Sequence, residues 1–148
     1  MTARRTALAC TLAASALALG ACGMMGMRGS SPMMADMMTV PLSAAQEVPP
    51  NSSPGTGTGR VQLDGTTLRW NITYSGTTGP VTAAHFHGPA PAGANAGVVL
   101  GFQPPVTSPI NGSATVTPAQ IADIKAGRWY INLHTAANPG GEIRGQVR

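Results

Sequence analysis

The segment from Arg60 to Tyr74 alternates polar and apolar residues on both sides of an Asp64-Gly65 pair. Alternation with a period of two is typical of a strand that buries one face, and Asp-Gly between two such runs favours a tight β-hairpin. The apolar residues that would face a core are Val61, Leu63, Leu68, Trp70 and Ile72. Because an isolated hairpin is only marginally stable, this segment predicts a larger antiparallel sheet around it.

Short runs of the same kind recur along the chain, separated by turn residues. The 19 Gly and 13 Pro among 148 residues supply those turns, and only 9% of residues are charged. Further strands are expected over 40–44, 81–87, 98–102, 112–116, 128–134 and 142–148, with a long loop over 46–59. This pattern predicts an all-β fold, an antiparallel β-sandwich with Greek-key-like connections, similar to immunoglobulin domains or to superoxide dismutase.

One helix is expected, and it is short. Thr117 is a suitable N-cap, Pro118 fits the first helical position, Gln120 completes a capping box and Gly127 follows the C-terminus. A helix of this length serves as a crossover between strands.

All three histidines of the chain fall on two of the expected strands. His85 and His87 share one face of the 81–87 strand with Val81 and Ala83, because side chains alternate with a period of two. His134 shares a face of the 128–134 strand with Tyr130 and Asn132, while Trp129, Ile131 and Leu133 occupy the other. If the two strands are neighbours, the three imidazoles converge within ligand distance.

A His-x-His pair with a third histidine predicts a metal site. Imidazole nitrogen binds Cu(II) best among divalent first-row ions, and copper in superoxide dismutase is held by a similar arrangement. Glu142, Asn132 or a water would supply a fourth ligand. The alternative is structural: each ring hydrogen-bonds a backbone group near Gly88 or Thr135 and stabilises one end of the sandwich.

The sequence offers no constellation for hydrolysis or group transfer, so we expect a protein that is not an enzyme. It contains no Gly-x-Ser-x-Gly elbow, and its five acidic residues lie in unrelated segments. A copper-dependent redox enzyme stays a second alternative. The formal net charge of the chain, +4, is too small and its basic residues are too scattered to favour binding of nucleic acid.

Residues 1–21 are predicted to be an export signal. Arg4 and Arg5 precede an uncharged apolar run, and Leu19-Gly20-Ala21-Cys22 resembles a lipoprotein processing site. Cys22 would then be the lipidated first residue of the mature protein. Since Gly23 rather than Asp follows it, the expected location is the bacterial cell envelope, anchored to the outer membrane rather than the inner one.

Residues 22–38 are expected to form a flexible, Met-rich tether. Every methionine except Met1 lies here: Met24, Met25, Met27, Met33, Met34, Met37 and Met38. Interspersed Gly, Ser and Pro argue against a stable helix. Thioethers select Cu(I), so these residues are candidate Cu(I) ligands. The alternative is an apolar stretch that lies against lipid.

Three long motifs resemble the CHRD domain, a family named for its repeats in chordin and also found as a single domain in bacterial exported proteins. They span 42–50 (LSAAQEVPP), 83–89 (AAHFHGP) and 133–147 (LHTAANPGGEIRGQV). The resemblance covers the expected domain, 39–148, and implies an extracytoplasmic β-sandwich. Because it implies little about activity, two hypotheses remain: an exported, lipid-anchored copper-binding protein, or a cell-surface interaction module with structural histidines.

Overall fold

The computed structural model describes residues 35–148. The predicted signal, Cys22 and the methionines from Met24 to Met34 lie outside the described residues. The strands are β1 (Asp36–Ser43), β2 (Thr56–Asp64), β3 (Thr67–Ser75), β4 (Val81–His87), β5 (Val98–Gly101), β6 (Ile110–Thr115), β7 (Tyr130–Thr135) and β8 (Ile143–Gln146). A 3-10 turn, η1 (Ala44–Gln46), follows β1, and the helix α1 (Pro118–Lys125) precedes β7.

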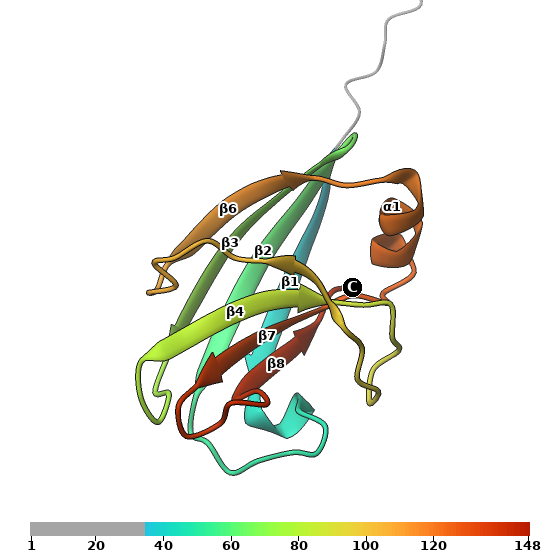
Figure 1. Ribbon diagram of the computed structural model, residues 1–148. Coiled ribbons are helices and arrows are strands. Elements are labelled where there is room, and N and C mark those ends of the chain that lie inside the picture. The colour runs from blue at the N-terminus through green and yellow to red at the C-terminus, as the bar shows by residue number, and fades with distance from the viewer. Residues whose placement is uncertain (1–34) are drawn as a thin grey trace, which may run out of the picture. The chain divides into compact units, whose positions relative to one another are not determined.

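All eight strands belong to one antiparallel sheet in the order β5-β4-β7-β8-β1-β2-β3-β6. The sheet curls into a half-barrel, so that its two halves face each other across the core (Figure 1). The halves join where β1 pairs with β8, a contact whose register contains only Ser43 and Arg144. The predicted all-β antiparallel fold with one short helix is confirmed, and the two sandwich halves form a continuous sheet.

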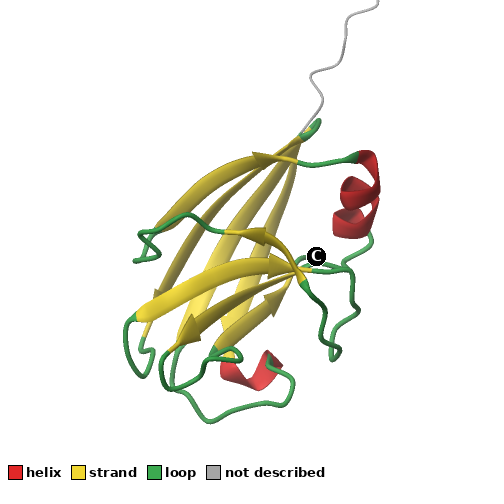
Figure 2. Cartoon of the chain, viewed as in Figure 1, coloured by secondary structure: helices red, strands yellow, loops and turns green. Residues whose placement is uncertain are grey.

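The two helical segments lie at opposite ends of the curled sheet (Figure 2). At the start of α1, the Thr117 side chain accepts a hydrogen bond from the backbone N–H of Gln120, and the Gln120 side chain accepts one from the backbone N–H of Thr117, which is a capping box. Gly127 follows with a positive φ of 66°. The helix connects β6 on one edge to β7 in the other half, so the predicted crossover is confirmed. No helix within residues 35–148 is long and apolar enough to cross a membrane.

The core fills the inner face of the curl. Asp64 pairs with Thr67 and Leu63 with Leu68, so the hairpin turn is Gly65-Thr66. The core residues of the hairpin are buried as predicted: Val61, Leu63, Leu68, Trp70 and Ile72. Partners from the other half include Phe86, Ile131, Leu133 and Ile143. Burial of side chains of this size contributes about 1.5–3 kcal/mol each.

Strand β1 begins four residues earlier than expected, which corrects the predicted tether of 22–38. Met37 pairs with Gln62 and Met38 with Val61, so both methionines belong to the sheet. Met38 packs against the core, whereas Met37 is 62% exposed. Neighbouring residues of a strand point to opposite faces, and these two are therefore not ligands of one ion in a flexible segment.

Other details differ from the predictions as well: β6 begins two residues earlier than expected, at Ile110, and β7 begins two residues later, at Tyr130. The loop expected over 46–59 is shorter, because β2 already begins at Thr56 and pairs with β1 there. In β4 the register shifts between Val81 and Ala83, a bulge that turns Val81 toward the core instead of the histidine face.

Candidate metal centre

The three histidines lie on the outer face of the sheet, opposite the core. The apolar residues of β4 and β7, such as Phe86 and Leu133, point inward, so the alternating residues His85, His87 and His134 point outward. Strands β4 and β7 are hydrogen-bonded neighbours, with His85 opposite Asn132 and Ala83 opposite His134. His134 is therefore a diagonal neighbour of His85, within reach of a long side chain.

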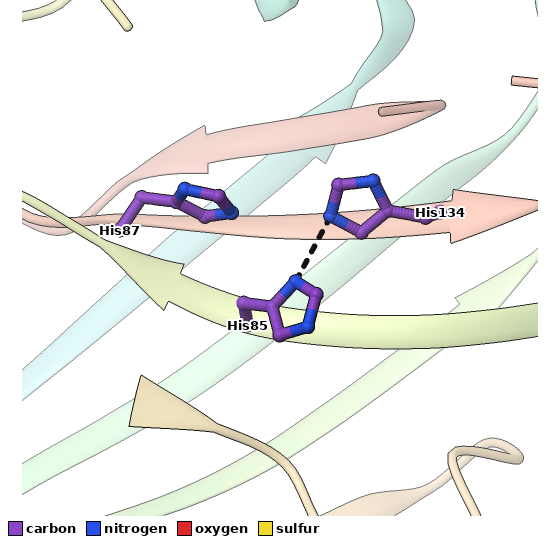
Figure 3. A group of neighbouring side chains, drawn as sticks. All are labelled: His85, His87 and His134. Carbon is purple, nitrogen blue, oxygen red and sulfur yellow. Dashed lines mark hydrogen bonds between the residues drawn. The ribbon is translucent and has the colours of Figure 1, made fainter. Parts of the chain in front are cut away.

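One nitrogen from each ring lies within 4.8 Å of the other two. His85 Nδ1 and His134 Nε2 are 3.1 Å apart, and Figure 3 shows the three rings gathered over the two strands. Shared ligation at about 2.0–2.1 Å requires nitrogens roughly 3–4 Å apart, so only small side-chain movements separate this arrangement from a coordinated one. The predicted convergence of the three rings is confirmed, while metal binding stays a prediction.

Backbone carbonyls fix the orientation of two of the rings. His87 Nδ1 donates to Ala96 O at 3.0 Å, and His134 Nδ1 donates to Pro139 O at 3.0 Å. A neutral imidazole has one N–H and one lone pair, so both residues have their lone pair on Nε2. Metal-ligating histidines in proteins are typically held in this way, by a hydrogen bond from the other ring nitrogen.

His87 Nε2 is buried and has no hydrogen-bond partner within the described residues. The structural hypothesis accounts for His87 Nδ1, for His134 Nδ1 and for the His85–His134 contact, but leaves this atom unexplained. An unsatisfied buried acceptor costs about 1–3 kcal/mol. A metal ion among the three rings would remove that cost.

All three rings favour the neutral form that a ligand requires. Burial lowers the pKa of His85, and the neighbouring His134 and His87 lower it further. Burial also lowers the pKa of His87 and of His134, although the hydrogen bonds to Ala96 and Pro139 partly oppose this. The lowered pKa values favour the neutral form of each ring, which is the form that has a lone pair to offer a metal ion.

Glu142 is not available as a fourth ligand, which corrects one sequence expectation. Its two carboxylate oxygens accept from Ser53 Oγ, from Thr78 N and Oγ1, from Thr135 Oγ1 and from Asn138 Nδ2. A carboxylate has about four lone-pair sites, so these five donors saturate it. Burial raises the pKa of Glu142, but the hydrogen bonds outweigh burial and lower the pKa to about 2.

A comparison with protein-family models matches residues 38–147 to the CHRD domain. The chain belongs to the CHRD domain family. Searches of curated proteins and of solved structures each found no match. The family match contains β1 from Met38 onward and both histidine strands, so the candidate metal centre lies inside the CHRD domain and residues 1–37 lie outside it.

In this CHRD domain the histidines belong to a larger buried polar surface, which we call the covered outer face. It consists of the outward residues of β4, β7 and β8: His85, His87, Tyr130, Asn132, His134, Arg144 and Gln146. All but the half-buried His85 are buried. Two loops contribute to its cover, because Asn95 donates to Val48 O and Gln146 donates to Ala90 O.

Tyr130 and Arg144 position the loop that holds His87. Tyr130 Oη accepts from Ala96 N at 3.0 Å and donates to Ala96 O at 3.2 Å. Arg144 donates to Asn95 Oδ1 and to Ala94 O. Arg144 and Gln146 were not among the predicted site residues, although their alternation with Ile143 and Val147 places them on the histidine face.

Asn132 stays a candidate fourth ligand. It lies on the histidine face opposite His85, and its buried Oδ1 has no partner among residues 35–148. Within the same residues its Nδ2 makes a single, long hydrogen bond of 3.5 Å to Glu47 Oε2. Burial raises the pKa of Glu47 to about 7, with Arg144 and Asn132 opposing the rise. The covered outer face thus combines three neutral imidazoles with an amide oxygen and a carboxyl that is half neutral at pH 7.

Proposed function

We propose that this CHRD-domain protein is an exported, lipid-anchored copper-binding protein whose three-histidine cluster holds one copper ion. The observation that carries the proposal is His87 Nε2, a buried lone pair with no partner among the described residues, within 4.8 Å of ligand nitrogens from His85 and His134. A structural role needs the hydrogen bonds at Nδ1 of His87 and His134, but it does not need an unpartnered nitrogen.

The choice of copper is supported by the type of donor. Imidazole nitrogens bind Cu(II) more tightly than they bind the other divalent first-row ions. No acidic side chain joins the cluster within residues 35–148. Thioethers are soft ligands that suit Cu(I), and five methionines between Met24 and Met34 precede the domain. Both donor types bind copper, and a site for calcium or magnesium would need oxygen ligands instead.

The anchor and the tether complete the proposal. Lipid on Cys22 would hold the domain at the membrane of the cell envelope, in the outer membrane by preference, as the lipoprotein-like motif supports. The methionines at 24, 25, 27, 33 and 34 would capture Cu(I). Mass spectrometry of the membrane fraction would find a diacylglyceryl group on Cys22, and a mature N-terminus elsewhere contradicts the anchor.

The central experiment is a copper titration of the purified protein and of a variant with His85, His87 and His134 replaced by Ala. We expect one tightly bound copper for the wild type, loss of that site in the triple variant, and a rise of Tm with copper only in the wild type, since a ligand stabilises the state that binds it. Asn71→Ala, on the exposed part of the sheet, is the control. Equal copper binding by wild type and triple variant would favour the interaction module instead.

The tether requires a substitution rather than a truncation. A chain beginning at Thr39 lacks the first three residues of β1, including Asp36, which pairs with Lys125 at 2.8 Å. Replacing the five methionines from Met24 to Met34 by Leu keeps the sheet intact and a similar apolar character. We expect this variant to lose Cu(I) capacity while the histidine site is retained. Unchanged Cu(I) capacity would leave the tether as an apolar segment near lipid.

A further inference from the structure

Arg144 places a positive charge inside the covered outer face. Its side chain is 1% exposed. The guanidinium donates to Asn95 Oδ1 at 3.0 Å, to Ala94 O at 2.8 Å and to Gln146 Oε1 at 3.4 Å. All three acceptors are neutral, so these hydrogen bonds hold the guanidinium without cancelling its charge.

No carboxylate forms an ion pair with Arg144 in the part of the chain that the structure describes. The ion pairs there are Lys125–Asp36 and Arg128–Asp123, both partly exposed. Besides Tyr130, the acid whose charge acts on Arg144 is Glu47. Glu47 makes no ion pair with Arg144 within residues 35–148, so it does not cancel the charge of the guanidinium at contact distance.

A stack of planar groups leads from this charge to the histidine cluster. The Arg144 guanidinium carbon lies 3.5 Å from the centre of the Tyr130 ring. The Tyr130 and His87 rings are parallel within 6°, with centres 4.9 Å apart. The three groups come from β8, β7 and β4, which are consecutive in the sheet.

We propose that Arg144 makes the three-histidine site selective for a monovalent ion, Cu(I) or the similar Ag(I), over divalent Cu(II) and Zn(II). This inference rests on the proposed copper site. Three imidazoles contribute no negative charge, so the ion's own charge is repelled by the buried guanidinium. The two stacking distances, 3.5 Å and 4.9 Å, place the guanidinium carbon no more than about 8 Å from the centre of the His87 ring. At about 8 Å and an effective dielectric constant near 20, the repulsion for each unit of charge corresponds to a change of about thirtyfold in affinity. Imidazole donors by themselves favour Cu(II) among divalent ions, and the field of Arg144 opposes that preference.

The test compares Cu(I) and Cu(II) dissociation constants, each measured by competition with a chelator, for the wild type, Arg144→Gln and Arg144→Lys. Loss of the charge in Arg144→Gln should shift the ratio of the two constants toward Cu(II) by tenfold or more. A tenfold shift of this ratio lowers the reduction potential by about 59 mV for a one-electron couple. Arg144→Lys keeps the charge and should keep the ratio within about threefold of the wild type.

Glu47→Gln provides an independent variant should Arg144→Gln fail to fold. This variant removes a negative charge that acts on Arg144, so the ratio should shift toward Cu(I), opposite to Arg144→Gln. A purely structural Arg144 would weaken binding of both ions equally in both Arg144 variants, and that result overturns the inference. If the wild type and the triple histidine variant bind copper equally, the copper site itself is refuted. If the triple variant loses copper but the ratio of the two constants is unchanged in Arg144→Gln and in Glu47→Gln, only the role of Arg144 is refuted.

Discussion

Both halves of the sheet carry polar residues on their outer face, but the two sets of residues have different surroundings. On β2 and β3 they are Arg60, Gln62, Arg69, Asn71 and Thr73, which are exposed or half-buried and which we call the open outer face. On β4, β7 and β8 they form the covered outer face, and six of its seven residues are buried. Polar groups on the open face bind water, whereas those on the covered face must find partners in the protein.

Because the covered outer face is shielded from water, its buried polar atoms that lack a partner point to a functional role. Four buried side-chain atoms lack a partner within residues 35–148: Glu47 Oε1, Trp70 Nε1, His87 Nε2 and Asn132 Oδ1. Two of them belong to the covered outer face, and Glu47 packs next to it. A surface made mainly of satisfied polar groups, with a few unpartnered lone pairs near three imidazoles, suits an ion better than a purely structural role.

The largest effect on stability is expected at Glu142, at the edge of the covered half. Glu142→Gln replaces an acceptor of five hydrogen bonds by a group that also donates, and the free energy of unfolding should fall by about 3 kcal/mol or more. Because the folded pKa is lowered from 4.5 to about 2, the wild type should lose this contribution as the pH falls from about 4.5 to about 2. Urea unfolding at several pH values measures both. Asp64→Asn, beside the hairpin turn, is the control, and an equal loss there would contradict the comparison.

The contribution of Glu47 to stability should depend on pH with the opposite sign. Its folded pKa is raised from 4.5 to about 7, so the unfolded chain ionises first and stability falls as the pH rises between these values. Glu47→Gln should therefore gain stability relative to the wild type between pH 5 and pH 8, by roughly 2–3 kcal/mol. The histidines are common to both proteins, so their titration cancels in the difference. A constant difference across this range would show that Glu47 is not buried as described.

Tyr130→Phe should have a moderate effect confined to the covered face. It removes the acceptor of Ala96 N and one donor to Ala96 O, so the free energy of unfolding should fall by about 1–2 kcal/mol. Hydrogen exchange of the Ala96 amide should accelerate, because that amide loses its partner. Copper affinity should also weaken, since Ala96 O orients His87. Unchanged exchange at Ala96 would contradict this arrangement.

The smallest effect is expected on the open outer face. Asn71 Nδ2 donates to Asn111 Oδ1 at 2.6 Å between β3 and β6, where water can replace either partner. Asn71→Ala should therefore change the free energy of unfolding by no more than about 0.5 kcal/mol and leave copper binding unchanged. A loss as large as that of Tyr130→Phe would remove the distinction between the two faces.

Local sequence patterns were enough to predict most of the fold. The hairpin around Asp64-Gly65, the Thr117 capping box and the bounds of β4 all follow from residues close in sequence, and the structure confirms them, with the hairpin turn one residue later, at Gly65-Thr66. The early start of β1 was missed because Met37 and Met38 resemble the methionines of the tether. Only pairing with Gln62 and Val61 defines them as strand residues, and that pairing is not local.

For the site, the sequence by itself determined that His85 and His87 share a strand face, although Val81 leaves that face through the bulge in β4. The scarcity of histidine made His85, His87 and His134 candidates. Only the tertiary structure decided that β4 and β7 are neighbours, that Glu142 is saturated by donors from four other residues, and that Arg144 is buried next to Tyr130. The physical reason is that the decisive partners of the rings are backbone carbonyls, at Ala96 and Pro139. Every residue has such a carbonyl, so no sequence pattern marks it, and the folding of the loops alone brings it to a histidine.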